Sequence, residues 1–99
     1  MKFIVVEKET PQGLLLIVTD KDIFGKKFEE GKVQLDLTKS FYEGNEKEKD
    51  EVKELFFKSR HVHLTGKQTI ALGIELDCVD PKRILWVKGI PHAQVVMEG

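Results

Sequence analysis

Five consecutive apolar residues, Leu14 to Val18, leave few folds open to this chain. A run of this length without alternation is typical of a β-strand that is covered on both faces, so we expect a central strand here. Lys2 to Glu9, with β-branched residues at its middle, predicts a neighbouring strand. The turn sequence Thr10 to Gly13 predicts that the two strands pair as a hairpin.

The rest of the chain predicts helices between two groups of strands. After the hairpin, the expected elements are, in order, a short helical turn within residues 19–31, a strand over 33–38, a helix from Asn45 to Arg60, a link over 61–64, a second helix that begins at Thr65, and strands over 84–87 and 93–97. Asp20 or Asp22 is the expected cap of the short turn. The order β-β-(short α)-β-α-α-β-β indicates an α+β domain with a mostly antiparallel sheet and two main helices on one face.

Composition limits the class of protein. The 99 residues suffice for a single domain, residues 1–99, and are too few for two cores. The one cysteine, Cys78, excludes an intrachain disulfide and fits a reducing compartment. No apolar run approaches the roughly 18 residues of a membrane span, so we expect a cytoplasmic protein without a membrane partner. Lys and Glu far outnumber Asn and Gln, a bias typical of heat-adapted proteins.

The C-terminal strand contains the strongest candidate site. Pro91 lacks a backbone donor, so its segment is expected at a sheet edge, a strand start or a bulge. His92 and Gln94 are two residues apart and therefore share one face of an extended chain. A titratable ring then lies beside an amide that both donates and accepts hydrogen bonds, a pattern that indicates a polar contact site without indicating a reaction.

Aromatic and basic residues suggest a second feature. The net charge of −1 argues against a protein that binds nucleic acid by bulk charge, but it leaves a local basic patch open. The residue types that stack on bases and contact phosphates in single-strand binders occur at Phe41, Tyr42, Trp86, Lys26, Lys27, Lys39 and Lys88. Gly25 precedes two of these lysines without the spacing of a nucleotide-binding loop, which favours an exposed turn.

Other chemistry is weakly indicated. His61, His63 and His92 are a set from which a three-histidine zinc site is built, but their spacing is not diagnostic and ordinary histidines are the simpler interpretation. Cys78 follows an apolar helix, where a buried thiol is expected to be inert. We therefore predict no metal site and no cofactor.

Three segments together resemble a known family. Residues 24–31, 40–44 (Ser-Phe-Tyr-x-Gly) and 89–96 (Gly-Ile-Pro-His-Ala-Gln-Val-Val) resemble the archaeal domain of unknown function 424, across essentially the whole chain. The resemblance implies an archaeal origin and a small single domain, and it carries no established activity. The positions that match its motifs are Gly25, Phe41, Tyr42, Gly44, Pro91, His92 and Gln94. His61 and His63 fall outside that pattern, which weakens the zinc hypothesis further.

Three functions from different classes follow. The first is a non-enzymatic binding module for RNA or a translation-related protein, with polar contacts from His92, Gln94 and Tyr42 and phosphate contacts from Lys26, Lys27 and Lys88. The second is a small enzyme that uses His92 as a general base. The third is a structural protein whose C-terminal strand forms an edge that pairs with another chain, as a homodimer or a complex.

Overall fold

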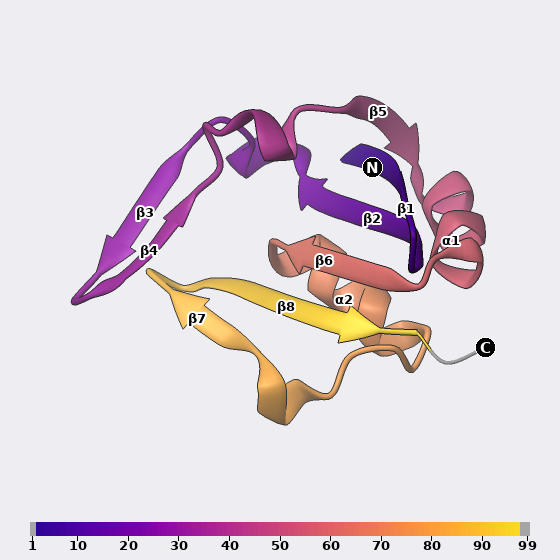
Figure 1. Cartoon of the computed structure of the whole chain (residues 1–99). Helices are drawn as coiled ribbons and strands as arrows, with labels where there is room; N and C mark the ends of the chain where they lie inside the picture. The colour runs from indigo at the N-terminus through magenta and orange to yellow at the C-terminus, as the bar shows by residue number, and fades with distance from the viewer. Residues whose placement is uncertain (1, 98–99) are drawn as a thin grey trace.

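The computed structural model describes residues 2–97, which form one main sheet, a separate two-stranded hairpin and two α-helices (Figure 1). The strands of the main sheet lie in the order β5-β1-β2-β6-β8-β7. The strands are β1 (Lys2–Thr10), β2 (Gly13–Asp20), β3 (Lys27–Glu30), β4 (Val33–Asp36), β5 (Asn45–Glu48), β6 (His61–Thr65), β7 (Leu85–Val87) and β8 (Ile90–Val96). The helices are α1 (Lys49–Lys58) and α2 (Lys67–Glu75), with short 3-10 turns η1 (Lys21–Ile23), η2 (Ser40–Tyr42) and η3 (Pro81–Arg83).

The α+β class, the first hairpin and the central position of its second strand are confirmed. β1 and β2 pair antiparallel from Thr10 opposite Gly13 to Phe3 opposite Asp20. β2 lies between β1 and β6, and its residues from Leu16 to Asp20 are all buried. The unbroken apolar run therefore belongs to a strand that is covered on both faces.

The prediction of a link over residues 61–64 is wrong. These residues belong to β6, which is parallel to β2 and antiparallel to β8 in the middle of the sheet. Val62 and Leu64 are completely buried, whereas His61 and His63 are partly exposed. This is the alternation of a half-buried strand, but five residues were too few to reveal its period beside a helix.

Several element boundaries also differ from the predictions. Residues 45–48 form the edge strand β5, and Glu48 rather than Asn45 is the N-cap of α1, with a capping box to Glu51. A strand at Lys27–Glu30 was missed, and β8 begins at Ile90, before the predicted start at residue 93. These differences add the strands β3 and β5, shift the start of α1 and of β8, and leave the fold class unchanged.

Both helices cover one face of the main sheet. The buried cluster between helices and sheet takes side chains from alternate strand positions and from both helices: Phe3, Val5, Leu16, Val18, Val62, Leu64 and Ala93 from strands, Val52 and Phe56 from α1, and Ile70 and Leu72 from α2. We call the opposite side the open face. The β3–β4 hairpin packs near one end of the open face through a second cluster that includes Leu35, Leu37 and Val87.

Asp20 caps a helix other than the one predicted. It precedes η1 without capping it, and its carboxylate instead accepts hydrogen bonds from the backbone N–H groups of Gln68 (2.9 Å) and Thr69 (2.7 Å) at the start of α2. The Thr69 hydroxyl donates a third hydrogen bond of 2.6 Å to the same carboxylate. Thr65, the expected first residue of this helix, is the last residue of β6. A carboxylate suits this position because helix N-termini carry partial positive charge and free donors.

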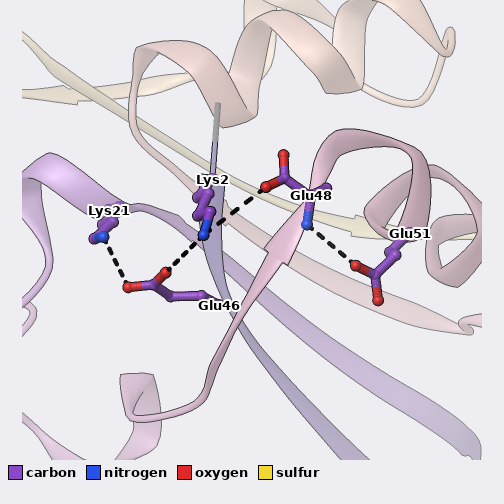
Figure 2. A network of polar contacts seen from close by, with 5 residues as sticks. All are labelled: Lys2, Lys21, Glu46, Glu48 and Glu51. Atoms are coloured by element: carbon purple, nitrogen blue, oxygen red, sulfur yellow. Dashed lines mark hydrogen bonds and ion pairs between the residues drawn. The ribbon is translucent and has the colours of Figure 1, made fainter.

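The edge strand β5 is held to β1 and η1 by exposed ion pairs (Figure 2). The Lys21 Nζ lies 2.8 Å from a carboxylate oxygen of Glu46, and the Lys2 Nζ lies 3.7 Å from the other. Lys2 also approaches Glu48, at 4.0 Å. Both lysines are therefore paired with neighbouring carboxylates.

No helix within residues 2–97 is long and apolar enough to cross a bilayer.

Candidate functional site

A pocket of about 530 Å³ lies on the open face, between β8 and the segment that carries β4 and η2. Its lining residues come from three parts of the chain: Gln34, Leu35, Asp36, Lys39, Phe41 and Tyr42 from the β4–η2 segment, Leu85 from β7, and His92 and Gln94 from β8. Five residues that the sequence indicated, Lys39, Phe41, Tyr42, His92 and Gln94, therefore line one pocket. We call it the open-face pocket.

The polar side of the pocket is formed by residues that strand alternation puts on the open face. His92 lies opposite Thr65 and Gln94 lies opposite His63 in the β6–β8 register, so all four residues belong to the open face. The Gln94 side chain is exposed and makes no hydrogen bond with the rest of the described chain. Its amide is therefore available to donate to and accept from a ligand.

The aromatic side of the pocket depends on η2. Backbone hydrogen bonds from Tyr42 to Lys39 (3.0 Å) and from Glu43 to Ser40 (3.1 Å) close this short turn. Gly44 follows it and packs so closely on β1 that any Cβ would collide with the Val5 carbonyl group. A glycine is required here because it lets η2 approach the sheet.

A row of rings crosses the open face from η2 to β8. The Phe41 ring meets the Tyr42 ring edge to face at 5.1 Å between centroids, and it meets the His63 ring at 5.4 Å. The His63 and His92 rings are 6.3 Å apart, and the Lys8 ammonium lies 5.3 Å from the centre of the Phe41 ring. Such contacts restrain the ring orientations, so the wall of the pocket is built before a ligand arrives.

His92 is buried and neutral at physiological pH. Its side chain is 8% exposed, and its Nδ1 lies 2.8 Å from the Thr65 hydroxyl oxygen. Burial, with a smaller contribution from His63, lowers the pKa of His92 from 6.5 to about 4. The Nε2 atom has no hydrogen-bond partner within residues 2–97. One ring nitrogen is thus fixed by Thr65, and the other is left for a ligand or water.

Tyr42 and Asp36 in the pocket, and His63 beside it, also have shifted pKa values. Burial, and then the charge of Asp36, raises the pKa of Tyr42, so its hydroxyl stays protonated. Hydrogen bonds from Thr38, with Lys27 and Lys39 nearby, lower the pKa of Asp36 and keep it ionised. Burial lowers the pKa of His63, and His61 adds to that effect. The pocket therefore presents the Asp36 carboxylate and the basic side chain of Lys39 beside neutral donors and acceptors.

Seven of the residues that the sequence indicated for binding lie outside the pocket lining, Trp86 and Gly44 among them. Gly25 has a φ of +81° and donates a backbone hydrogen bond to Leu37 at 3.2 Å, while Lys26 accepts one from Leu37 at 2.9 Å. Their backbones hold the β3–β4 hairpin in place, and Lys27 begins β3.

The remaining two have backbone roles at the β7–β8 hairpin. Lys88 occupies the turn with a φ of +52°, and its N–H donates to a Glu30 carboxylate oxygen at 2.9 Å. Pro91 is buried within β8 opposite Trp86, and its carbonyl accepts a hydrogen bond from the Gly66 N–H at 2.9 Å. Pro91 is therefore near the start of β8, one of the positions expected for it, and it does not line the open-face pocket.

Sequence reasoning missed part of the site. Gln34 and Asp36 are alternate residues of the predicted strand over 33–38, so their position on one face of that strand could be predicted from the sequence. The contact of Thr65 with His92 follows from the β6–β8 register. It could not be predicted, because the sequence predicts a link and not a strand over residues 61–64.

The three histidines do not form a metal centre: within residues 2–97, no group of three or more His, Cys, Asp or Glu side chains is placed to hold a metal ion.

Comparisons with known proteins agree with the architecture. No curated protein matches the sequence. The fold is similar to the crystal structure of an uncharacterized conserved protein from Methanopyrus kandleri, with a TM-score of 0.77 and 17% identity over 100% of this chain and 96% of that chain. At this identity the similarity shows the fold alone. The model of the family described as "Protein of unknown function (DUF424)" matches residues 8–97, and the chain therefore belongs to the DUF424 family.

Proposed function

We propose that this protein is a non-enzymatic binding module whose open-face pocket takes an unpaired base of single-stranded RNA. The observation that carries the proposal is the convergence of Phe41, Tyr42, His92 and Gln94 on one pocket of about 530 Å³. Three separate parts of the chain contribute to it, and a heteroaromatic ring with polar edges matches its mixture of rings and amides.

The polar groups of the pocket suit the edges of a base. A nucleobase presents donors and acceptors side by side, and the amides of Gln34 and Gln94 supply both kinds of group. The Asp36 carboxylate adds an acceptor, and the free Nε2 of His92 adds a group whose role depends on the tautomer. These contacts would distinguish one base from another.

Two lysines supply phosphate contacts beside the pocket. Lys39 lines it, and Lys8 lies over the Phe41 ring. Neither ammonium has a carboxylate within 4.0 Å in the described part of the chain, whereas Lys27 is paired with Glu29 at 3.2 Å. The proposal therefore assigns phosphate contact to Lys39 and Lys8 in place of Lys26, Lys27 and Lys88.

The chemistry of His92 disfavours the enzymatic alternative. Its Nδ1 is fixed by the Thr65 hydroxyl, whereas a catalytic imidazole is commonly oriented by a carboxylate. With its pKa lowered to about 4, His92 is also a weaker base than an ordinary imidazole. Its neutral state suits hydrogen bonding to a neutral ligand.

Anisotropy measurements with a labelled pool of single-stranded RNA hexamers test the proposal. We expect Gln94→Ala to weaken binding by roughly tenfold, the loss of one good base contact. Lys39→Ala should lower the slope of log affinity against log salt by about 0.7. Lys26→Ala is the matched control, because Lys26 is exposed but does not line the pocket. Absence of binding, or equal losses for Lys39→Ala and Lys26→Ala, would contradict the proposal.

A further inference from the structure

The outer edge of β8 is open beyond His92. β7 pairs with β8 only from Ile90 to His92, whereas β6 pairs with it as far as Val96. The predicted C-terminal edge is therefore right only in part, because β8 is flanked on both sides at its start and on one side at its end. What remains open is a short length of backbone at the end of the strand.

The direction of the free backbone groups follows from two hydrogen bonds. The Pro91 carbonyl accepts from Gly66, and the Met97 N–H donates to Arg60 at 2.7 Å, both on the β6 side. Successive residues of a strand point their N–H and C=O groups to opposite sides. The N–H and C=O of Gln94 and Val96 therefore point away from β6, and within residues 2–97 no strand lies beside them to pair with them.

A groove of about 340 Å³ runs along this open edge. Its inner wall is β8, and its outer wall is the segment between α2 and β7, which passes beside the end of β8 (Figure 1). The lining residues are Cys78, Val79, Asp80 and Arg83 on the outer side and Ala93, Gln94, Val95 and Val96 on the inner side. The outer wall would keep the β8 edges of two copies of this chain from meeting, so the groove suits one extended segment and not a symmetric homodimer.

Charge complementarity indicates the composition of that segment. Arg83 is exposed, and no carboxylate in the described part of the chain lies within 4.0 Å of its guanidinium group. The Asp80 carboxylate is already engaged by the Lys82 N–H at 2.9 Å. Val96, which is 57% exposed, offers apolar contact beside the free backbone groups.

We infer that this groove binds an extended acidic peptide of a partner protein by strand addition to β8. The backbone of the peptide pairs with Gln94 and Val96, one of its carboxylates meets Arg83, and its apolar side chains contact Val96. Main-chain hydrogen bonds give affinity in this mode, and the flanking side chains give specificity. This site goes beyond the proposed RNA pocket: it takes a different ligand, and of the residues that line the two sites only Gln94 is common to both.

Selection from a phage-displayed library of random ten-residue peptides tests the inference, followed by affinity measurements on the enriched peptides. Val96→Pro removes an outward N–H that pairs with no strand, so the fold is retained, as thermal unfolding will check. Val96→Ala is the matched control that keeps the N–H. We expect enriched acidic peptides that bind the wild-type protein and Val96→Ala similarly, and both Val96→Pro and Arg83→Glu at least about tenfold more weakly.

Two results would overturn the inference: no enrichment above an unrelated protein, or enriched peptides that bind Val96→Pro and Arg83→Glu as tightly as wild type. Arg83→Glu alters only an exposed side chain, so it remains informative if Val96→Pro unfolds. Lys39→Ala, which affects only the open-face pocket, should leave peptide binding unchanged. The failure of one proposal is thereby distinguishable from the failure of the other.

Discussion

The Thr65 hydroxyl oxygen lies 2.8 Å from the Nδ1 of His92, and this contact joins the last residue of β6 to the pocket face of β8. Both side chains are buried, and the two residues are directly opposite in the β6–β8 register. The contact fixes the ring plane of His92 and leaves Nε2 as its free nitrogen. The position of one hydroxyl thus decides which atom His92 offers to a ligand.

Replacing Thr65 tests the energetic importance of this contact. In Thr65→Val the side chain keeps its volume but the buried Nδ1 of His92 loses its partner, so we expect the free energy of unfolding to fall by about 1–3 kcal/mol. Thr65→Ser retains the hydroxyl, and its free energy of unfolding should fall by less. Urea unfolding followed by circular dichroism measures both. Equal stability of wild type and Thr65→Val would show that the hydrogen bond contributes nothing.

The stability of the protein should fall on acidification, between about pH 6.5 and pH 4. His92 has a pKa of about 4 when folded and an ordinary value near 6.5 when unfolded, so the unfolded chain binds more protons in this interval. The stabilisation is complete above pH 6.5, and up to about 3 kcal/mol is lost as the pH falls through the interval. The pKa of His63 is also lowered and acts in the same direction.

The His92→Gln variant is the control for this pH dependence. Its unfolding free energy should vary less with pH than that of the wild type, whatever its stability at pH 7. Chemical unfolding at half-unit pH steps gives both curves. Parallel curves for the two proteins would exclude His92 as a source of the acid sensitivity.

Asp20 should contribute strongly to stability. Its carboxylate accepts three hydrogen bonds from Gln68 and Thr69 at the start of α2, so Asp20→Ala is expected to cost about 2 kcal/mol or more. Asp22→Ala, an exposed neighbour, is the control and should change stability by less than about 0.5 kcal/mol. The two midpoints of thermal unfolding give the comparison, and similar midpoints would refute the capping role.

Gly44 should control the position of η2. A Cβ there would collide with the Val5 carbonyl group, and only backbone displacement relieves that collision. We expect Gly44→Ala to be destabilised and to bind RNA more weakly, because Phe41 and Tyr42 move with η2. Gly31→Ala is the control, since a Cβ at Gly31 meets no atom within 4 Å and only its φ of +61° is strained. Equal RNA affinity for Gly44→Ala and wild type would show that η2 does not position the RNA-binding residues.

The elements that could be predicted from sequence are those with a local signal. The turn after Thr10 and the apolar runs beside it define the β1–β2 hairpin without reference to the rest of the chain. The polar residues of β5, Asn45 to Glu48, resemble a solvated helix start, so the sequence alone predicts a helix there. Its strand conformation results from pairing with β1, which is a tertiary interaction.

The part of the candidate site that could be predicted also rests on a local signal. His92 and Gln94 share a face by strand alternation, and that expectation holds for any strand in which they lie. Their proximity to Phe41 and Tyr42 depends on how η2 crosses the sheet, and the parallel pairing of β2 with β6 depends on contacts remote in sequence. No local pattern encodes such pairings, so the pocket itself could not be foreseen.

The most direct test of the RNA proposal is an NMR titration of the isotope-labelled protein with single-stranded RNA hexamers. We predict shifts in the ring signals of His92 and Tyr42 and in the side-chain amides of Gln34 and Gln94, with the Lys26 amide unchanged. An RNA-free pH titration of the same sample should place the His92 pKa near 4. Shifts confined to residues outside the open-face pocket, or no shifts at millimolar RNA, would contradict the account.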